Sequence, residues 1–411
     1  MENLILFDDK SRIEHLKPFT YTRPIADIRI GILTIREKWE KNLQAKASFY
    51  TQFHLSDKFQ CKIAPVNLLV NASVLPDLAL VNRIRQLPLH HALCNEETIL
   101  ALKLDATATR MYLGGQMPEQ LAFVDWTAPY LQLKHIWDIF SLNDTEIRKD
   151  FNLLSKGRKS QVLESHNRLL GSIEDLFIEE GAKIDCAILN TKTGPIYIGK
   201  DAEVMEGSML RGPLALCEHA ATKMGTKIYG ATTLGPHCKV GGELNNVVLF
   251  GYSNKGHDGF LGNSVIGEWC NLGADTNNSN LKNNYGEVKV WNYASEKLEN
   301  SKLQFCGLFM GDHSKCGINT MFNTGTVVGV AANIFGAGFP PKFIPSFSWG
   351  GAENFVTYRP EEAVEAAEKM MSRRKIELSH DDEQILRTVF EQSMKFRSWE
   401  NNRDANLNTT V

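Results

Sequence analysis

The chain contains 411 residues, of which 43% are hydrophobic and 23% charged, and its formal net charge is -3. This length exceeds what one ordinary hydrophobic core supports, and it predicts two or three domains of a soluble globular protein. The charge argues against a nucleic-acid-binding protein, although it is compatible with a local basic pocket for a phosphate group.

The eight cysteines and the apolar runs indicate in which cellular compartment the protein is expected. The cysteines form no CxxC pair, which argues against a zinc ribbon or a thioredoxin-like site. No apolar run reaches the roughly 18 residues of a membrane-spanning helix, and the first residues do not resemble a signal peptide. We therefore expect a cytoplasmic protein.

Residues 1–150 alternate short apolar runs with helical patterns. Residues 4–7 and 67–71 are predicted to be buried strands, and residues 32–39 have helical character. Such alternation predicts an α/β domain with a largely parallel sheet. The polar stretch 151–175 is expected to be a connector.

A six-residue repeat follows the connector and is the strongest signal in the chain. Aliphatic residues recur every six positions, interrupted only by Thr222, at Ile198, Val204, Leu210, Leu216, Ile228, Leu234 and Val240. Two further phases of the repeat contain Ile266 and Leu272, and then Met310, Cys316, Phe322, Val328 and Ile334. Insertions are expected where the phase changes, and the largest lies between residues 277 and 305.

This repeat predicts a parallel β-helix over residues 176–350. One aliphatic residue on each side of a triangular coil would point inward, and glycine would relieve tight corners where φ is positive. The alternative is a β-sandwich with glycine-rich turns, but its strands would alternate with period two and its turns would be irregularly spaced. Residues 351–411 instead predict a helical segment, with helices over 360–371 and 380–397.

Polar residues concentrate between positions 251 and 280, inside the repeat. They include His257, which lies near Lys255, and the later amides of Asn271 and Asn280. Histidine is the usual general base near neutral pH, and amide side chains suit sugar hydroxyls and the amide-bearing arm of a coenzyme. A lone histidine is more often a surface or structural residue, so the residues alone leave both interpretations open.

This stretch resembles the acetyltransferase half of the bifunctional glucosamine-1-phosphate N-acetyltransferase / N-acetylglucosamine-1-phosphate uridylyltransferase family. The matching residues are Gly256-His257, Leu261-Gly262, Gly267, Asn271-Leu272-Gly273-Ala274, Thr276 and Asn280. The resemblance implies a left-handed β-helix of hexapeptide repeats, with His257 as catalytic base, Asn271 as a sugar contact and Asn280 near acetyl-CoA. Lys255 is expected to hold the phosphate of the sugar through its charge.

Residues 16–24 read Leu-Lys-Pro-Phe-Thr-Tyr-Thr-Arg-Pro and resemble the Leu-x-Pro-Leu-Thr-x-x-x-Pro-Lys motif of the sugar nucleotidyltransferases. The glycine-rich phosphate loop of that family and the acidic residue that holds Mg2+ are missing. Asp8 and Asp9 would either replace that acid or only close the first strand, so nucleotidyl transfer stays open. The candidate phosphate contacts, which could instead form a solvated basic face with interdomain salt bridges, are Arg12, Arg23, Arg29 and Lys38.

The leading hypothesis is an acetyl-CoA-dependent N-acetyltransferase acting on an amino-sugar 1-phosphate. With a nucleoside triphosphate and Mg2+, the N-terminal domain would also form a nucleotide sugar of the UDP-N-acetylglucosamine kind. One alternative is a sugar-1-phosphate nucleotidyltransferase whose β-helix only trimerises the protein. Another is a non-enzymatic carbohydrate-binding or regulatory module. A homotrimer is expected, because the coils alone leave an apolar flank and a coenzyme groove needs a neighbouring subunit.

Overall fold

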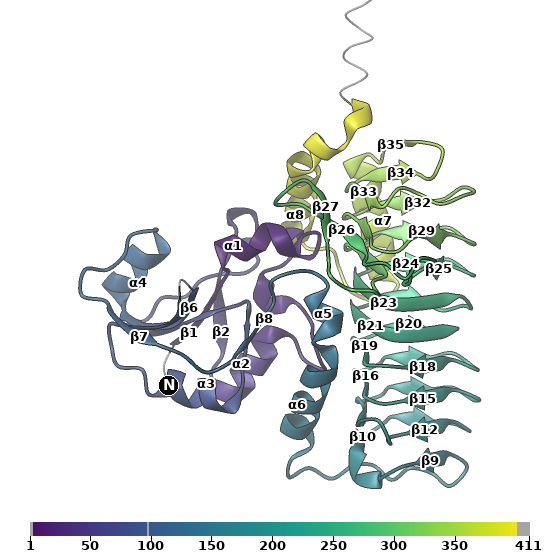
Figure 1. Ribbon diagram of the computed structural model, residues 1–411, viewed down its shortest axis with the longest axis horizontal. Helices are drawn as coiled ribbons and strands as arrows, with labels where there is room; N and C mark the ends of the chain where they lie inside the picture. Colours follow the sequence, from purple (N-terminus) through teal and green to yellow (C-terminus); the bar gives the residue numbers. More distant parts are fainter. Residues whose placement is uncertain (1–2, 97, 401–411) are drawn as a thin grey trace, which may run out of the picture. The chain divides into compact units, whose positions relative to one another are not determined.

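The computed structural model describes residues 3–96 and 98–400. They form two compact units (Figure 1). The N-terminal unit contains residues 3–16, 22–28 and 33–135, and the β-helix unit contains residues 17–21, 29–32 and 136–400. The end of the expected C-terminal segment, residues 401–411, lies outside the described residues.

The N-terminal unit is built on a six-stranded sheet in the order β2-β1-β3-β6-β5-β7. The strands are β1 (Asn3–Phe7), β2 (Ala47–Tyr50), β3 (Val66–Asn71), β5 (His91–Asn95), β6 (Thr98–Asp105) and β7 (Ala122–Asp125). β1 pairs in parallel with β2 and β3, and β5 pairs in parallel with β7. β6 runs antiparallel to both β3 and β5. The expected α/β fold is confirmed, with one strand of this sheet reversed. A separate antiparallel pair joins β4 (Val74–Leu75) to β8 (Leu131–Gln132).

Side-chain caps set where the helices of this unit begin. The helices are α1 (Lys10–Ile13), α2 (Ile35–Leu43), α3 (Leu78–Arg85) and α4 (Ala106–Leu113). The Thr34 hydroxyl accepts a hydrogen bond from the Glu37 amide at 3.2 Å, and the Glu37 carboxylate accepts one from the Thr34 amide at 2.7 Å. This capping box begins α2 at Ile35, three residues after the start of the expected helical stretch.

Asp8 is a buried carboxyl at the end of β1. Its Oδ1 accepts a hydrogen bond from the Ile25 amide at 2.9 Å, and its Oδ2 accepts one from the Thr51 hydroxyl at 2.5 Å. The side chain therefore ties two later segments of the chain to the first strand. Burial raises the pKa of the Asp8 carboxyl to about 7.

The β-helix unit stacks short parallel strands on three sides of a left-handed coil. The first side contains β10 (Leu176–Ile178), β13 (Ile196–Ile198), β16 (Leu214–Leu216), β19 (Thr232–Leu234), β21 (Glu243–Gly251), β23 (Phe260–Glu268), β28 (Leu308–Met310), β31 (Thr326–Val328) and β33 (Phe343–Ile344). The second contains β9 (Arg168–Leu170), β12 (Ile188–Asn190), β15 (Met209–Arg211), β18 (Lys227–Tyr229), the first residues of β21 and β23, β25 (Asn277–Asn278) and β30 (Met321–Phe322). The third contains β11 (Lys183–Ile184), β14 (Glu203–Val204), β17 (Ala221–Thr222), β20 (Lys239–Val240), β22 (Asn254–Lys255), β24 (Asn271–Leu272), β29 (Lys315–Cys316), β32 (Asn333–Ile334) and β34 (Ser348–Gly350).

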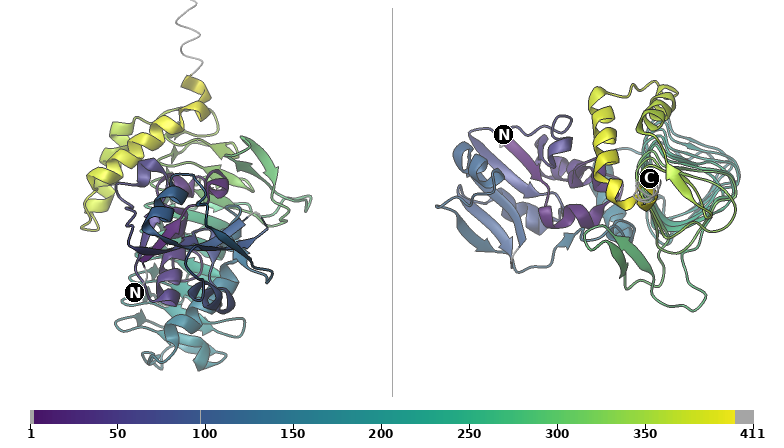
Figure 2. Two further views of the ribbon diagram at one scale, coloured as in Figure 1. Left: turned by 90° about the vertical axis from the view of Figure 1, so that its left-hand side faces the viewer. Right: turned by 90° about the horizontal axis from the view of Figure 1, so that it is seen from above.

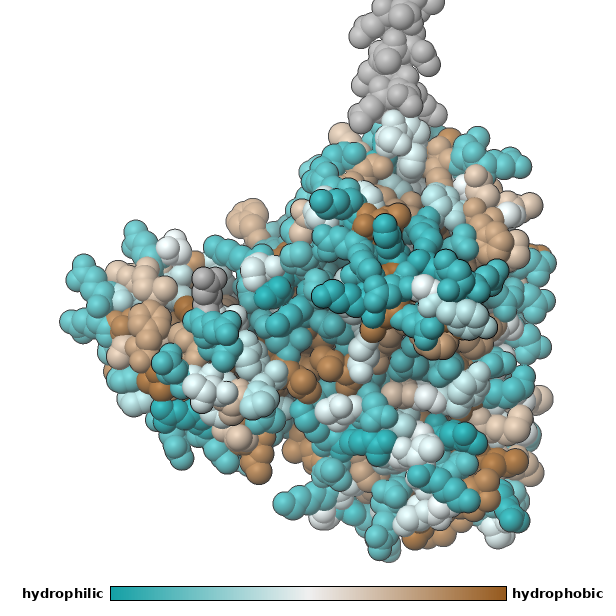
Figure 3. Space-filling view, in the orientation of Figure 1, coloured by the Kyte–Doolittle hydropathy of each residue, from teal (hydrophilic) through white to brown (hydrophobic). Residues whose placement is uncertain are grey.

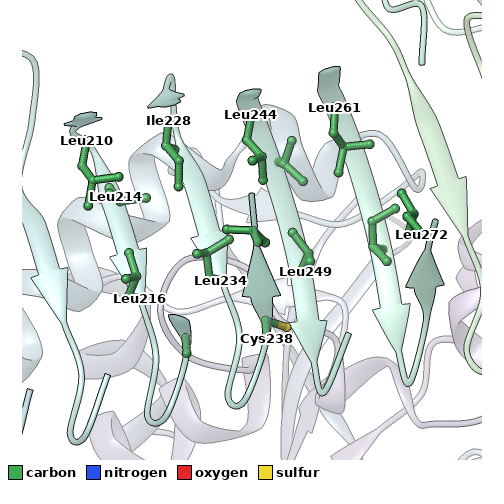
Figure 4. Packing of buried hydrophobic residues seen from close by; sticks show 14 of the residues in the cluster. Leu210, Leu214, Leu216, Ile228, Leu234, Cys238, Leu244, Leu249, Leu261 and Leu272 are labelled. Atoms are coloured by element: carbon green, nitrogen blue, oxygen red, sulfur yellow. The ribbon is translucent and has the colours of Figure 1, made fainter. Parts of the chain in front are cut away.

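The inward positions of these strands carry the six-residue repeat. Ile198 pairs with Leu216, which pairs with Leu234, so successive coils superpose their aliphatic side chains. The predicted repeat positions are buried in one core cluster, whose side chains form the rows in Figure 4. Thr222, which interrupts the repeat, is also buried. Seen from above in Figure 2, the coils lie over one another. The parallel pairing excludes the β-sandwich.

The expected insertion between residues 277 and 305 contains an antiparallel hairpin, β26 (Lys289–Asn292) and β27 (Lys297–Asn300). The β-helix ends with β35 (Phe355–Thr357), which pairs antiparallel with β34. The C-terminal helices are α7 (Pro360–Ser372) and α8 (His380–Gln392). No helix within residues 3–96 and 98–400 combines the length and the apolar character needed to cross a membrane.

The boundary of the compact units differs from the expected domain boundary at residue 150. Helices α5 (Asp138–Ser141) and α6 (Asn143–Ser155) belong to the β-helix unit. The Asn143 side chain donates a hydrogen bond to the Ala231 carbonyl at 3.0 Å, and Phe151 packs with Phe177 and Tyr197. The apolar face of α6 is therefore buried against the coils. The expected connector, residues 151–175, contains the last turns of α6 and the first strand of the β-helix, β9.

The raised pKa of Asp8 predicts a specific pH dependence of stability. Between about pH 4 and pH 7, the native state keeps a proton that the carboxyl of the unfolded chain has lost, so stability falls as the pH rises through this range. Asp8→Asn keeps an acceptor and cannot ionise. Urea unfolding at pH 5 and pH 8 should show a larger loss of unfolding free energy in the wild type than in Asp8→Asn. An equal loss in both proteins would contradict a buried, protonated Asp8.

Candidate functional site

A pocket of about 640 Å³ opens in the N-terminal unit at the carboxyl ends of its parallel strands. Phe7, Tyr50 and Asn71, the last residues of β1, β2 and β3, line it. In open α/β sheets, ligands bind at this edge. The pocket is therefore the candidate site of the N-terminal unit.

Two acids of this pocket are occupied by hydrogen bonds within the protein. Asp9 caps α1 by accepting hydrogen bonds from the Ser11 amide at 2.9 Å and the Ser11 hydroxyl at 2.7 Å. Its second oxygen accepts a hydrogen bond from the Asn71 side chain at 3.2 Å. Both oxygens of Asp8 are engaged as described above. These contacts support the interpretation that the two acids close the first strand. The described residues contain no group of three metal-binding side chains.

Arg12 is the predicted phosphate contact that the structure places in this pocket. Its Nε is buried and has no hydrogen-bond partner among the described residues. Lys10 and His15 also line the pocket, so three basic side chains surround a volume large enough for a phosphorylated ligand.

The other three predicted phosphate contacts lie elsewhere. Arg23 and Lys38 are buried in the N-terminal unit and are not among the described residues that line the pocket. Arg29 belongs to the β-helix unit, where its Nε donates a hydrogen bond to the Phe250 carbonyl at 2.9 Å. Because all three side chains are buried, they do not form a solvated basic face. The sequence could not reveal this, since arginine and lysine are usually exposed.

The candidate site of the β-helix unit is the corner between β22 and β23, residues 256–259. His257 is exposed at this corner. Lys255 is not: it takes an inward position as the register partner of Val240 and is only 1% exposed. Its ammonium group donates to three backbone carbonyls, and burial lowers its pKa to about 8. The expectation that Lys255 holds a sugar phosphate is therefore corrected, because its charge is used inside the coil.

Asn271 and Asn280 lie on the coil that follows the corner. Asn271 begins β24 as the register partner of Asn254 and is half-buried. The Asn280 side chain donates a hydrogen bond to the Asn263 side chain at 2.8 Å. Asn280 and the Phe260 ring both approach Gly262, where an added Cβ would lie 2.7 Å from Asn280 Nδ2 and 2.5 Å from the ring. Asn280 therefore lies beside the strand that leaves the His257 corner.

The neighbouring asparagines have a structural role that the sequence did not indicate. Asn277 accepts a hydrogen bond from the Phe260 amide at 2.7 Å, and Asn278 accepts one from the Gly262 amide at 2.8 Å. Asn278 also donates to the Gly262 carbonyl at 3.0 Å. These side chains hold the first residues of β23 to the next coil, immediately after the His257 corner.

An exposed groove of about 570 Å³ lies on the same side of the β-helix, and sequence reasoning missed it. It combines apolar and charged side chains, namely Leu170, Ile188, Asn190, Met209, Leu210, Arg211, Lys227, Ile228, Tyr229 and Glu243. Lys227 pairs with Glu243, and Glu243 pairs with Phe260, so the groove ends at β21, one strand before the strand that follows His257. Hydrophobic atoms reach the surface among the lower coils in Figure 3, with hydrophilic side chains around them. The sequence does contain a signal for this groove. The outward residues that line it, such as Met209 and Lys227, each directly precede an inward aliphatic residue of the repeat.

Comparison with known proteins extends these observations. Residues 4–159 match the model of the sugar nucleotidyl transferase family. A bifunctional sugar-1-phosphate nucleotidylyltransferase/acetyltransferase of Sulfurisphaera tokodaii is 30% identical over 194 residues, which are 46% of this chain and 44% of that protein. The bifunctional protein GlmU of Methanocaldococcus jannaschii is 34% identical over 87 residues, which are 21% of each chain. The matches thus span less than half the length of these relatives.

Among solved structures, the polySia specific acetyltransferase NeuO matches at 13% identity and a TM-score of 0.25, and the match covers 47% of this chain and 82% of that one. By sequence, the chain is similar to a bifunctional sugar-1-phosphate nucleotidylyltransferase/acetyltransferase, and its residues 4–159 match the sugar nucleotidyl transferase family model.

Proposed function

We propose that the β-helix unit is an acetyl-CoA-dependent N-acetyltransferase acting on an amino-sugar 1-phosphate of the glucosamine-1-phosphate kind. The observation that carries the proposal is the exposed His257, at a corner one strand beyond a groove that offers both apolar and cationic groups. The Sulfurisphaera tokodaii relative is a bifunctional nucleotidylyltransferase/acetyltransferase, which supports the same class of reaction.

His257 would act as the general base. An amino sugar is largely protonated near pH 7, and only its neutral amine attacks a thioester. A neutral imidazole first takes one proton from the ammonium and passes it to solvent. As the neutral nitrogen then bonds to the acetyl carbon and the carbon–sulfur bond breaks, the imidazole takes the second N–H proton and gives it to the departing thiolate, so that one proton is released overall. Acetyl-CoA supplies the activated acyl group. The products are an N-acetylated sugar and free coenzyme, so the protein itself is unchanged.

Arg211 and Lys227 take the phosphate-binding role that Lys255 cannot fill. Both line the groove: Lys227 lies on β18, two strands from the β23 strand that follows His257, and Arg211 lies on β15, one strand farther away. Cationic side chains hold a sugar phosphate through charge-assisted hydrogen bonds. The apolar residues Ile188 and Met209 offer one wall for the arm of acetyl-CoA, and a neighbouring subunit of the expected homotrimer would offer another.

The N-terminal unit would form a nucleotide sugar, of the UDP-N-acetylglucosamine kind, from a sugar 1-phosphate and a nucleoside triphosphate. The pocket at the carboxyl ends of β1, β2 and β3 and the buried Nε of Arg12 support this second activity. The pocket does not offer Mg2+ a prepared set of protein ligands, since Asp8 and Asp9 already accept hydrogen bonds. The proposal therefore depends on Arg12, Lys10 and His15 as contacts to the phosphates.

His257→Ala tests the acyl transfer. Loss of a general base should lower turnover by about 10²–10⁴-fold, while the affinity for acetyl-CoA stays near the wild-type value. Release of free thiol from acetyl-CoA, with glucosamine 1-phosphate as acceptor, measures turnover. His380→Ala, which changes an exposed histidine on α8, is the matched control and should behave as wild type. Unchanged turnover in folded His257→Ala would remove the general-base role and favour the scaffold or the non-enzymatic binding module.

Arg12→Ala tests the nucleotidyl transfer. Loss of a charge-assisted contact of roughly 1.5–3 kcal/mol should slow pyrophosphate release by about 10–100-fold and leave acyl transfer intact. Pyrophosphate is followed with a sugar 1-phosphate, Mg2+ and each nucleoside triphosphate in turn. Arg110→Ala, which changes an exposed arginine on α4, is the control. If the wild type releases no pyrophosphate with any nucleotide, the pocket does not carry this reaction.

A further inference from the structure

The corner that carries His257 is closed differently from the comparable corners of nearby coils. In those coils, a threonine lies four positions after the inward residue. The hydroxyl of this threonine donates a hydrogen bond to the backbone carbonyl of the residue three positions before the threonine. The three pairs are Thr226 to Lys223 at 2.5 Å, Thr276 to Gly273 at 2.7 Å and Thr320 to Gly317 at 2.8 Å. All three threonines are buried, so the hydroxyl satisfies a carbonyl inside the corner.

The His257 corner has glycine where these corners have threonine. Gly259 lies four positions after the inward Lys255 and has no hydroxyl to donate. Its φ is +111°, whereas in the neighbouring corner the left-handed residue comes one position earlier, at Asp275 with φ of +54°. The backbone of residues 256–259 therefore follows a different path, and its carbonyls need another donor.

Lys255 donates from inside the coil to other carbonyls of this corner, and the Gly256 carbonyl, the counterpart of the threonine's acceptor, is not among them. Its ammonium group donates to the carbonyls of His257 at 2.8 Å, Asp258 at 3.1 Å and Gly241 at 3.3 Å. An ammonium has three N–H groups, and all three meet an acceptor here. Two of these acceptors belong to the corner itself, including the carbonyl of His257.

A lysine at this position costs stability compared with an aliphatic residue. Its register partner on the preceding coil is Val240, and the other inward residues of this side include Leu272. Burial disfavours the charged amine and lowers its pKa, although the nearby carboxylates of Asp258 and Asp275 favour the charge. The inward carbonyls of the corner would be unsatisfied with an aliphatic residue, which is costly for buried backbone groups.

We propose that Lys255 is a positioning residue, which fixes the backbone at His257 from inside the coil and thereby holds the imidazole at this corner. This role rests on the proposed acyl transfer at His257. It replaces the expected direct contact between Lys255 and the sugar phosphate.

Lys255→Met tests the proposal, because methionine has similar length, suits the apolar interior and donates no hydrogen bond. Amide hydrogen exchange of Glu243 and Phe260, whose amides donate to the Gly259 carbonyl and the Asn277 side chain at this corner, should become faster than in the wild type, while exchange in distant coils stays the same. Turnover should fall by about 10–100-fold with little change in coenzyme affinity, as expected when a catalytic group is misplaced by about 1 Å. Lys255→Gln retains two N–H donors and should recover part of both properties.

Lys239→Met is the matched control. Lys239 precedes Val240 on the preceding coil and is only half-buried, on the outer side of the same sheet. Its substitution should change neither the exchange of the Glu243 and Phe260 amides nor turnover. Unchanged exchange and unchanged turnover in Lys255→Met would overturn the proposal.

The wild-type protein gives a reading that does not depend on how the variants fold. Raising the pH from 7 to 9.5 deprotonates Lys255, and a neutral amine has only two N–H groups for three carbonyls. Protection of the Glu243 and Phe260 amides, corrected for intrinsic exchange rates, should fall over this range. The other titratable groups near the amine are Asp258, Asp275 and Cys316. Constant protection would contradict the positioning role of Lys255. A wild-type protein that transfers no acetyl group would instead refute the proposed function, and the exchange result would then concern the backbone of the corner alone.

Discussion

The β-helix unit depends on the superposition of inward aliphatic side chains from one coil to the next. Each coil buries its apolar edges only against its neighbours, and each buried aliphatic side chain contributes about 1.5–3 kcal/mol. Ile198, Leu216 and Leu234 illustrate the rule, since all three are fully buried and lie in register. The inward residues on the sides of the coil therefore tolerate few substitutions. Residues at the corners can instead be reactive side chains with little loss of stability.

The corner of residues 256–259 uses this freedom. Its carbonyls are satisfied by a lysine from the inward row, which leaves His257 exposed on the outside. The asparagines of the next coil hold the first residues of β23, and the groove with Lys227 lies along the same side. The rigid stack, the inward donor and the amides of the following coil thus fix the surroundings of one histidine. Such fixed geometry is what acyl transfer requires of a general base.

The sequence predicted the β-helix because a six-residue period with inward aliphatic residues is compatible with few folds besides this one. It did not predict the place of Lys255, because the repeat changes phase between Val240 and Ile266 and the inward row cannot be followed across that change. Arg29 was misplaced for a related reason: its hydrogen bond to the Phe250 carbonyl joins residues far apart in the chain. The compact units divide after residue 135, before the expected boundary at residue 150, because a helical pattern does not reveal which unit buries the apolar face of α6.

The most direct test of acyl transfer at the β-helix is a product analysis with the wild-type protein. Purified protein is incubated with acetyl-CoA and glucosamine 1-phosphate, and the sugar is examined by mass spectrometry beside a reaction without protein. We expect an N-acetylated sugar phosphate that accumulates in step with free coenzyme A. Release of coenzyme without any acetylated sugar, or no reaction with a panel of amino-sugar phosphates, would contradict the proposed acetyltransferase.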